Sequence, residues 1–205
     1  MSRIEAITIT TAIGGVKEAF DRIHAFTQPP AVGGTLLGAF TTEIGELNKV
    51  LVLRAFETDA DAAEDRNRAQ LSADPYGVSS VAASLSVSTY ALFPFLEPVT
   101  PGTSGPFYEV RTYGIKPNAV QATIDAWEKA VPARTRISPL TLAAYALDGP
   151  GPRFINIWPY ASLDARNASR AQAVEEGTWP PKGGPANLTT LNSEIYIPAP
   201  FSPLQ

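Results

Sequence analysis

The feature that most constrains the fold is an internal repeat that spans almost the whole chain. A shift of 104 residues places 50–56 on 154–160 and Arg66 on Arg170. Few of the paired residues are identical, but the order of residue types is shared, and a shift of 105 fits the segments near residues 40 and 145 better. The 205 residues are therefore predicted to hold two copies of one unit of about 100 residues, an ordinary size for a domain.

Each copy is predicted to have the order strand, helix, strand, strand, helix, strand. Residues 4–10 alternate and are rich in β-branched types, which favours a strand, and apolar residues then recur at the spacing of one helix face. Asp59 or Asp61 is the expected N-cap of the next helix. The predicted helices follow Val16, Phe20, Ile23 and Phe26, then 63–69, then Val120, Ile124 and Trp127, then 163–175, and the other strands lie near 36–41, 50–56, 85–93, 108–113, 140–146, 153–160 and 188–197.

The order βαββαβ is that of the ferredoxin-like unit, an antiparallel sheet with both helices on one face. The other face of each sheet must be buried, and the second unit of the chain is the nearest partner. The predicted fold class is therefore α+β, with two tandem ferredoxin-like units whose sheets pack face to face as an α+β barrel. The expected domains are residues 1–98 and 107–205, joined by a linker at 99–106 that is rich in proline and glycine.

Composition narrows the partners. Hydrophobic residues make up 44% and charged residues 18%, which is enough to form a packed core, and a net charge of -4 without any block of Lys or Arg argues against binding nucleic acid or a membrane. The N-terminus has no apolar leader, so a cytoplasmic location is expected. The sequence has no cysteine and a single histidine, His24, and these two residue types are the usual ligands of transition metals. We therefore expect no protein-bound transition metal, and the sequence implies no cofactor.

Three stretches resemble the NIPSNAP family. They are 108–113 with Lys116-Pro117, 42–50 running on to the arginine-bearing segment 66–68, and 193–198 with 201–203. Two departures stand out in the first copy: Ile7 lies at the position of Arg111, and Arg54 lies at the position of Trp158. Any site is therefore expected to differ between the two copies.

The resemblance implies the superfamily of ferredoxin-like α+β barrels. Its members include cofactor-free and haem-dependent monooxygenases, isomerases and proteins of unknown role, and no general reaction is established for NIPSNAP proteins. The resemblance thus leaves open whether the chain is an enzyme, because function depends on particular side chains rather than on a fold.

Polar and aromatic side chains share one face of two predicted neighbouring strands. We expect the more aliphatic face of each strand to meet the helices. The polar and aromatic face is therefore predicted to point into the space between the sheets, where it would form a pocket for a planar polar molecule. The alternative is a filled interior in which Glu109 and Arg111 form a structural ion pair. The candidate ligand-binding residues are Glu109, Arg111, Tyr113, Asn156, Trp158 and Tyr160, with Arg54 from the first copy.

Other polar residues have less specific interpretations. His24 lies beside an apolar helix face and is expected to be a surface or boundary residue, although its ordinary pKa would suit proton transfer. Arg66 and Arg170 recur at matching helical positions without an acid one turn away, so they are either an anion clamp or tertiary ion pairs. The proline- and glycine-rich segment 180–185 is predicted to be a loop that covers one end of the pocket.

Two hypotheses of function follow. In the first, the chain binds a small aromatic or acidic organic molecule between its sheets, and the family resemblance would allow cofactor-free monooxygenase or isomerase chemistry. In the second, the barrel interior is filled and the protein is a non-enzymatic interaction or structural module that forms homo-oligomers. A cavity lined by Arg111 and Trp158 would favour the first hypothesis.

Overall fold

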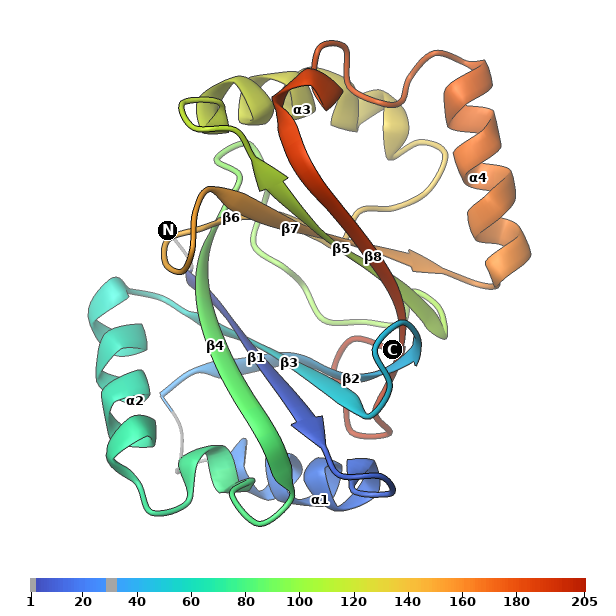
Figure 1. Ribbon diagram of the computed structural model, residues 1–205. Coiled ribbons are helices and arrows are strands. Elements are labelled where there is room, and N and C mark those ends of the chain that lie inside the picture. The colour runs from blue at the N-terminus through green and yellow to red at the C-terminus, as the bar shows by residue number, and fades with distance from the viewer. Residues whose placement is uncertain (1–2, 29–32) are drawn as a thin grey trace.

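A computed structural model describes residues 3–28 and 33–205, which form two units with the same order of elements (Figure 1). This order confirms the predicted βαββαβ repeat, and a short 3-10 helix precedes the last strand of each unit. The first unit contains β1 (Arg3–Thr11), α1 (Val16–Phe26), β2 (Thr35–Ile44), β3 (Lys49–Phe56), α2 (Asp59–Leu71), the 3-10 helix Pro75–Gly77 and β4 (Ala82–Leu92). The second contains β5 (Phe107–Ile115), α3 (Val120–Arg134), β6 (Leu142–Ala146), β7 (Arg153–Tyr160), α4 (Leu163–Glu175), the 3-10 helix Pro185–Asn187 and β8 (Leu188–Pro198).

The two sheets join at their edges into one closed barrel with the strand order β1-β3-β2-β8-β5-β7-β6-β4. Every pairing is antiparallel, and the helices of each unit lie on the outside (Figure 1). The joints between the units are short: β4 pairs with β6 only from Tyr90 to Leu92, and β2 pairs with β8 from Phe40 to Ile44. The prediction of an α+β barrel is confirmed. The barrel closes because the edge strands of one sheet pair with those of the other, β2 with β8 and β4 with β6.

The start of the second helix in each unit uses the same device. The hydroxyl of Thr58 accepts a hydrogen bond of 3.1 Å from the backbone N–H of Asp61, and the hydroxyl of Ser162 accepts one of 3.0 Å from Ala165. These caps satisfy N–H groups that have no partner within the helix. The prediction that Asp59 or Asp61 is the cap was therefore wrong: both belong to the first turn, where a negative charge favours the helix dipole.

Apolar side chains from both sheets fill the inside of the barrel. They come from inward-facing positions of the strands and from the C-terminus, and they include Ile4, Ala6, Leu51, Leu53, Tyr108, Val110, Ile155, Ile157, Tyr196 and Leu204. A separate apolar layer lies between each sheet and its helices. Both faces of each sheet are therefore buried over most of their extent, and the longest exceptions are the exposed stretches 83–86 of β4 and 189–193 of β8.

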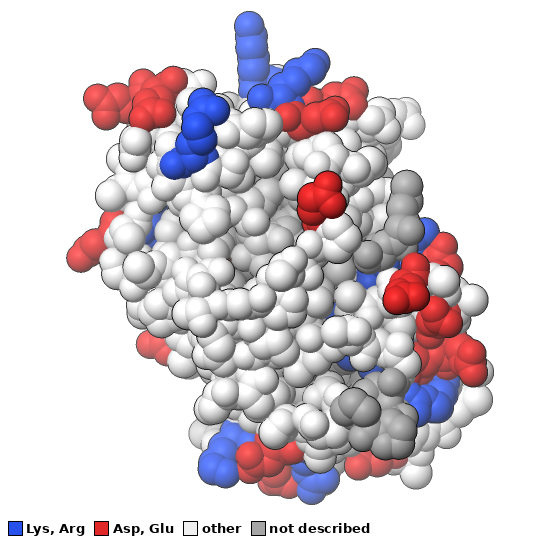
Figure 2. Space-filling model, turned by 180° about the vertical axis from the view of Figure 1, so that it is seen from behind, with Lys and Arg blue, Asp and Glu red and all other residues white. Residues whose placement is uncertain are grey.

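The linker and the C-terminal segment lie against each other. Gly102 donates a backbone hydrogen bond of 3.1 Å to the carbonyl of Pro203, and the Tyr108 hydroxyl donates one of 3.0 Å to the carbonyl of Gln205. Neither 99–106 nor 199–205 contains a charged side chain. Seen from behind, the molecule carries most of its charges around the rim, and the middle of that face is largely uncharged (Figure 2). Within the described part of the chain, no helix has the length and apolar character needed to cross a bilayer.

Candidate functional site

The candidate residues of the second unit come together, but on the opposite side of the sheet from the one expected. Trp158 and Tyr160 pack with Trp127 of α3, whereas Tyr108 and Ile157 point into the barrel. The prediction of a pocket between the sheets was therefore wrong. Hydrophobicity could not separate the two faces because both carry buried side chains, with Tyr108 and Ile157 on one side and Trp158 and Tyr160 on the other.

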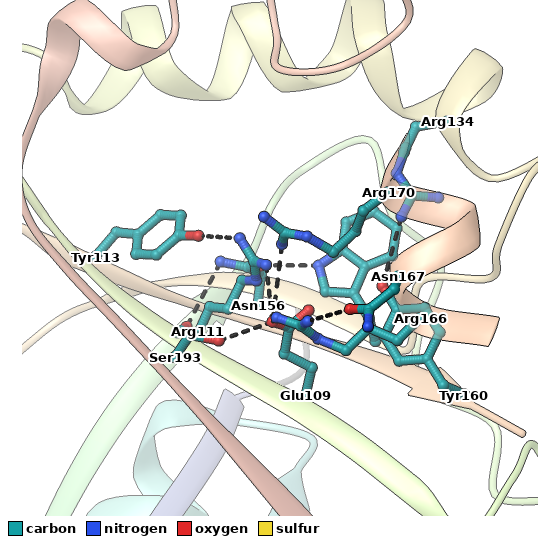
Figure 3. Close-up of polar contacts among 11 residues, drawn as sticks. Glu109, Arg111, Tyr113, Arg134, Asn156, Tyr160, Arg166, Asn167, Arg170 and Ser193 are labelled. Atoms are coloured by element: carbon teal, nitrogen blue, oxygen red, sulfur yellow. Dashed lines mark hydrogen bonds and ion pairs between the residues drawn. The ribbon is translucent and has the colours of Figure 1, made fainter. Parts of the chain in front are cut away.

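Glu109 of β5 is the centre of this cluster and is fully buried. Its Oε1 accepts hydrogen bonds from Arg111 Nη2 at 2.7 Å, from the Ser193 hydroxyl at 2.7 Å and from Arg166 of α4 (Figure 3). Arg170 Nη1 lies 3.8 Å from the same oxygen. The Glu109–Arg111 pair that was considered as a structural alternative is thus present, but Oε2 is buried without a hydrogen-bond partner.

These contacts fix the charges. Burial alone would raise the pKa of Glu109, but the hydrogen bonds from Arg111 and Arg166 outweigh it, so the pKa lies below its ordinary value. Burial would lower the pKa of Arg111, and the hydrogen bond to Glu109 reverses that effect. Glu109 is therefore an anion at neutral pH and a weak general base.

Arg134 at the end of α3 adds a second buried cation. It is only 3% exposed, and its guanidinium lies 4.6 Å from the centre of the Trp158 ring. One nitrogen contacts the Tyr160 hydroxyl at 3.5 Å, and the other, Nη1, is buried without a partner. Burial and the nearby Arg111 both lower the pKa of Arg134, although an arginine stays charged in proteins. A buried cation with so little compensation is costly to the fold.

Aromatic rings form the walls of the site. Trp158 and Trp179 meet edge to face with centroids 5.6 Å apart, and the Trp158 indole donates a hydrogen bond of 2.8 Å to Asn156. Tyr113 accepts a hydrogen bond from Arg111, and burial raises the pKa values of both Tyr113 and Tyr160. The tyrosines therefore remain neutral at physiological pH.

A cavity of about 20 Å³ remains between these side chains, and both Arg111 and Trp158 line it. This is room for about one water molecule. Helix α4 covers it: Arg170 is 44% exposed at its side chain, and Ala173 is the buried residue of this helix. The site is thus closed, beneath a helix that is anchored mainly by its arginines.

The first unit uses the matching positions differently. Arg54 replaces Trp158, is completely buried, and donates to Glu5 at 2.5 Å and to Asp65 at 2.5 Å. Its guanidinium also faces the rings of Phe26, Phe56 and Tyr76 at 5.1 to 5.5 Å. Arg54 is therefore neutralised by two acids within its own unit. The prediction that it contributes to the same site as the candidate residues of the second unit was wrong.

Arg66 and Arg170 approach the equivalent glutamates, Glu5 and Glu109, at 3.6 and 3.8 Å. Both are thus tertiary ion pairs, which was one of the two expected roles. Arg66 also contacts Asp148 of the β6–β7 turn at 3.0 Å. The basic residues of the first unit, Arg54, Arg66 and Arg68, form ion pairs with three acids. Two of these acids, Glu5 and Asp65, belong to the same unit, and Asp148 belongs to the second. In the second unit, Arg111, Arg134, Arg166 and Arg170 surround the single carboxylate of Glu109.

His24 does not belong to either cluster. It lies exposed on α1 and stacks on Phe201 at 4.6 Å, as expected for a boundary residue. Trp179, in the loop between α4 and β8, lines the cavity, whereas none of the residues 180–185 that were predicted to cover the pocket is among its lining residues. Four contributors were missed from the sequence: Arg134, Arg166, Trp179 and Ser193. Only Arg166 had a usable signal, since it precedes Arg170 by one helical turn and so shares its face.

A family model described as NIPSNAP matches residues 4–88 and 108–203. The chain belongs to the NIPSNAP family. A NipSnap homolog of Dictyostelium discoideum is 24% identical over 169 residues, covering 81% of this chain and 76% of that protein. The two matched segments coincide with the two units of the fold, so each unit is one NIPSNAP domain.

Solved structures share the whole architecture of this NIPSNAP protein. An anthrone oxidase-like protein superposes with a TM-score of 0.68 over 100% of this chain and 94% of its own, at 11% identity. A putative monooxygenase from Lactobacillus acidophilus gives a TM-score of 0.66 over 96% of this chain and 93% of its own, at 15% identity. Identities this low establish the common fold and leave the function to the side chains of the site.

Proposed function

We propose that this NIPSNAP protein binds one small planar organic anion per chain, between the sheet of its second unit and helices α3 and α4. Arg111 and Arg134 would hold the negative group, and Trp158 and Trp179 would contact the ring. Guanidinium groups bind carboxylates and enolates through paired hydrogen bonds, and aromatic walls favour flat ligands.

One observation carries this proposal: Arg134 is buried, and no acid among the described residues is bonded to it. A fold rarely keeps a buried charge without compensation unless the charge has a use. The first unit supplies the contrast: Nη1 is without a partner in both Arg54 and Arg134, but Arg54 also contacts the acids Glu5 and Asp65. The second unit lacks an equivalent set of acids at this point, and a bound anion would supply the missing charge.

Entry of the anion requires α4 to move. The cavity of about 20 Å³ is far below the roughly 300 Å³ of an ordinary ligand pocket. Arg166 and Arg170 tie α4 to Glu109, and a ligand that takes over these arginines would release the helix from the sheet. Binding therefore exchanges one ion pair of Arg166 and Arg170 for another, and it supplies a partner for Nη1 of Arg134, which has none in the closed site.

The same charges limit the chemistry. A cluster of cations lowers the pKa of a bound phenol or enol, because it stabilises the oxyanion. Glu109, with its lowered pKa, is poorly suited to take a proton. This arrangement supports binding of molecules that are already acidic. The likeness to an anthrone oxidase-like protein and to a putative monooxygenase is one of fold, so no oxidation step is assigned.

Thermal stability tests the proposal with pairs of aromatic ligands that share a ring system and of which only one carries a negative charge. 1-Naphthoate and 4-nitrophenolate should raise the melting temperature, whereas 1-naphthamide and nitrobenzene should not. A ligand at about 100 times its dissociation constant stabilises the folded state by about 2.7 kcal/mol, which for a chain of this size is about 5 to 10 °C. The absorbance of 4-nitrophenol should also show a lower pKa for the bound form.

Matched variants locate the site. Arg170→Ala should reduce the response to 1-naphthoate, whereas Arg66→Ala, at the equivalent position of the first unit, should preserve it. Calorimetric titration should give one site per chain. Equal responses to naphthoate and naphthamide, or an unchanged affinity in both Arg134→Met and Arg170→Ala, would show that the cluster is purely structural.

A further inference from the structure

Strand β4 has one edge that is only partly used. Along β1 it pairs from Ala82 to Ala91, with a β-bulge at Ala83. On the other side, β6 pairs with it only at Tyr90, Ala91 and Leu92. Residues 83–86 are exposed. The first half of β4 therefore borders solvent along the edge that faces away from β1.

The contacts of Thr89 show which residues of β4 direct their backbone N–H and C=O groups away from β1. Its N–H donates to Asp148 Oδ2 at 2.8 Å and its C=O accepts from the N–H of Leu147 at 2.8 Å, so both groups point away from β1. Alternate residues of a strand direct their backbone groups to the same side. Val87 and Leu85 therefore present their N–H and C=O groups outward, beyond the point where β6 ends.

The side chains of this edge carry no feature that discourages pairing. Residues 82–88 contain neither a charged residue nor proline, two of the usual devices that protect exposed edges, and the one such device here is a β-bulge at Ala83. Leu85 is 37% exposed and lies opposite Ile9 in the β1 register. An open, neutral edge with an exposed leucine can add a further strand.

We propose that β4 is a self-association edge, at which a second copy of this chain pairs its own β4 antiparallel around a twofold axis at Leu85. In this register Leu85 faces Leu85 of the partner subunit, and the two residues exchange both backbone hydrogen bonds. Val87 lies across from the partner's Ala83, where a bulge interrupts the alternation of the strand. The β4 of the second copy begins at Ala82, so it ends before the 147–152 turn.

The choice of a second copy rests on self-complementarity. A twofold contact places the same segment of both subunits face to face, so the assembly stops at a dimer. Any charged residue at its centre would meet the same charge on the partner subunit, which is unfavourable. The edge of β4 satisfies this condition, because Asp148 in the adjoining turn is already paired with Arg66 and Arg153. Strand β8 also has an exposed stretch, 189–193, but that edge adjoins a less balanced group of charges. Near it, the acids Glu43, Glu46 and Glu194 accompany the single basic residue Lys49.

Sedimentation equilibrium tests the edge on the full chain. At about 0.5 mM protein, an interface with a dissociation constant of about 0.1 mM or tighter is largely formed, and the mass should approach twice the 21.8 kDa of one chain. Leu85→Lys places two cations face to face and should return the mass to that of one chain. The matched control Leu191→Lys, on the exposed stretch of β8, should leave the dimer intact.

Amide hydrogen exchange on the unaltered protein provides a second measurement. Raising the concentration to about 0.5 mM should slow exchange at Leu85 at least threefold, because about a quarter of the chains or fewer remain monomeric, while Ser86, whose N–H faces β1, should stay unchanged. The proposal is overturned by a wild-type mass of one chain at about 0.5 mM, by a Leu85→Lys dimer, by loss of the dimer in Leu191→Lys, or by protection that appears along β8 instead.

Discussion

Arg134→Met should make the protein more stable and at the same time remove its anion site. In the native chain Nη1 of Arg134 is buried without a partner, and such a group costs about 1 to 3 kcal/mol. The variant gives up the stacking on Trp158, worth about 0.5 to 2 kcal/mol. The contact to Tyr160 is long at 3.5 Å and adds little. The balance is a gain of about 1 kcal/mol, or about 2 to 4 °C in melting temperature for a chain of this size.

Differential scanning calorimetry without ligand, followed by titration with 1-naphthoate, measures both effects. Arg136→Met is the matched control, since it removes the same charge from an exposed position two residues away and should change neither quantity. A fall in melting temperature of more than about 4 °C in Arg134→Met, which is about 1 kcal/mol, would refute the reasoning, because it would mean that Arg134 is compensated within the fold.

Glu109→Gln should destabilise the protein by about 3 kcal/mol, because it leaves buried arginines unpaired. Since the folded pKa of Glu109 is lowered, its contribution is complete above the unfolded value of about 4.3 and is lost as the pH falls further; urea titrations at several pH values should show a shallower acid limb in the variant, and an unchanged limb would count against the assigned ion pairs. Arg54→Met should cost about 3 to 5 kcal/mol by leaving Glu5 and Asp65 without their shared cation, while the calorimetric response to naphthoate persists; loss of that response would contradict the separation of the two sites. Gly105→Ala should lower the melting temperature by several degrees, because Gly105 has a φ of +142° and an added Cβ would lie 2.5 Å from the Tyr160 carbonyl oxygen. The expected cost is about 1 to 3 kcal/mol, and a calorimetric scan equal to that of the wild type would show that the linker can shift freely.

The repeat and the order of strands could be predicted because they depend on local patterns. Residues 153–160 and 163–175 were placed at the bounds that the structure has, since alternation and helix composition are visible within each segment. The capping hydroxyls of Thr58 and Ser162 recur 104 residues apart, but the acids after Thr58 obscured its role. Local sequence thus indicated which elements form and left their exact ends to capping geometry.

The site was harder to predict because its chemistry depends on which face of the sheet meets the helices. Glu109, Arg111 and Trp158 were grouped correctly by alternation, yet the group was assigned to the wrong side. Arg134 belongs to a different helix, and nothing in 133–136 shows which of its two arginines turns inward. That choice is made by the packing of α3 on Trp158, a contact between residues 24 positions apart.

Closure of the barrel within a single chain has a consequence for how its two sites can differ. A barrel assembled from two identical chains carries every substitution twice, so a change that strengthens one site alters its twin in the same way. Here the two positions are encoded separately, and Arg54 can stand where the other unit has Trp158. One unit can therefore devote its buried charges to holding the barrel together, with Arg54 between Glu5 and Asp65. The second unit can then keep an excess of arginines over acids around Glu109. In a barrel of two identical chains, both sites would carry that excess.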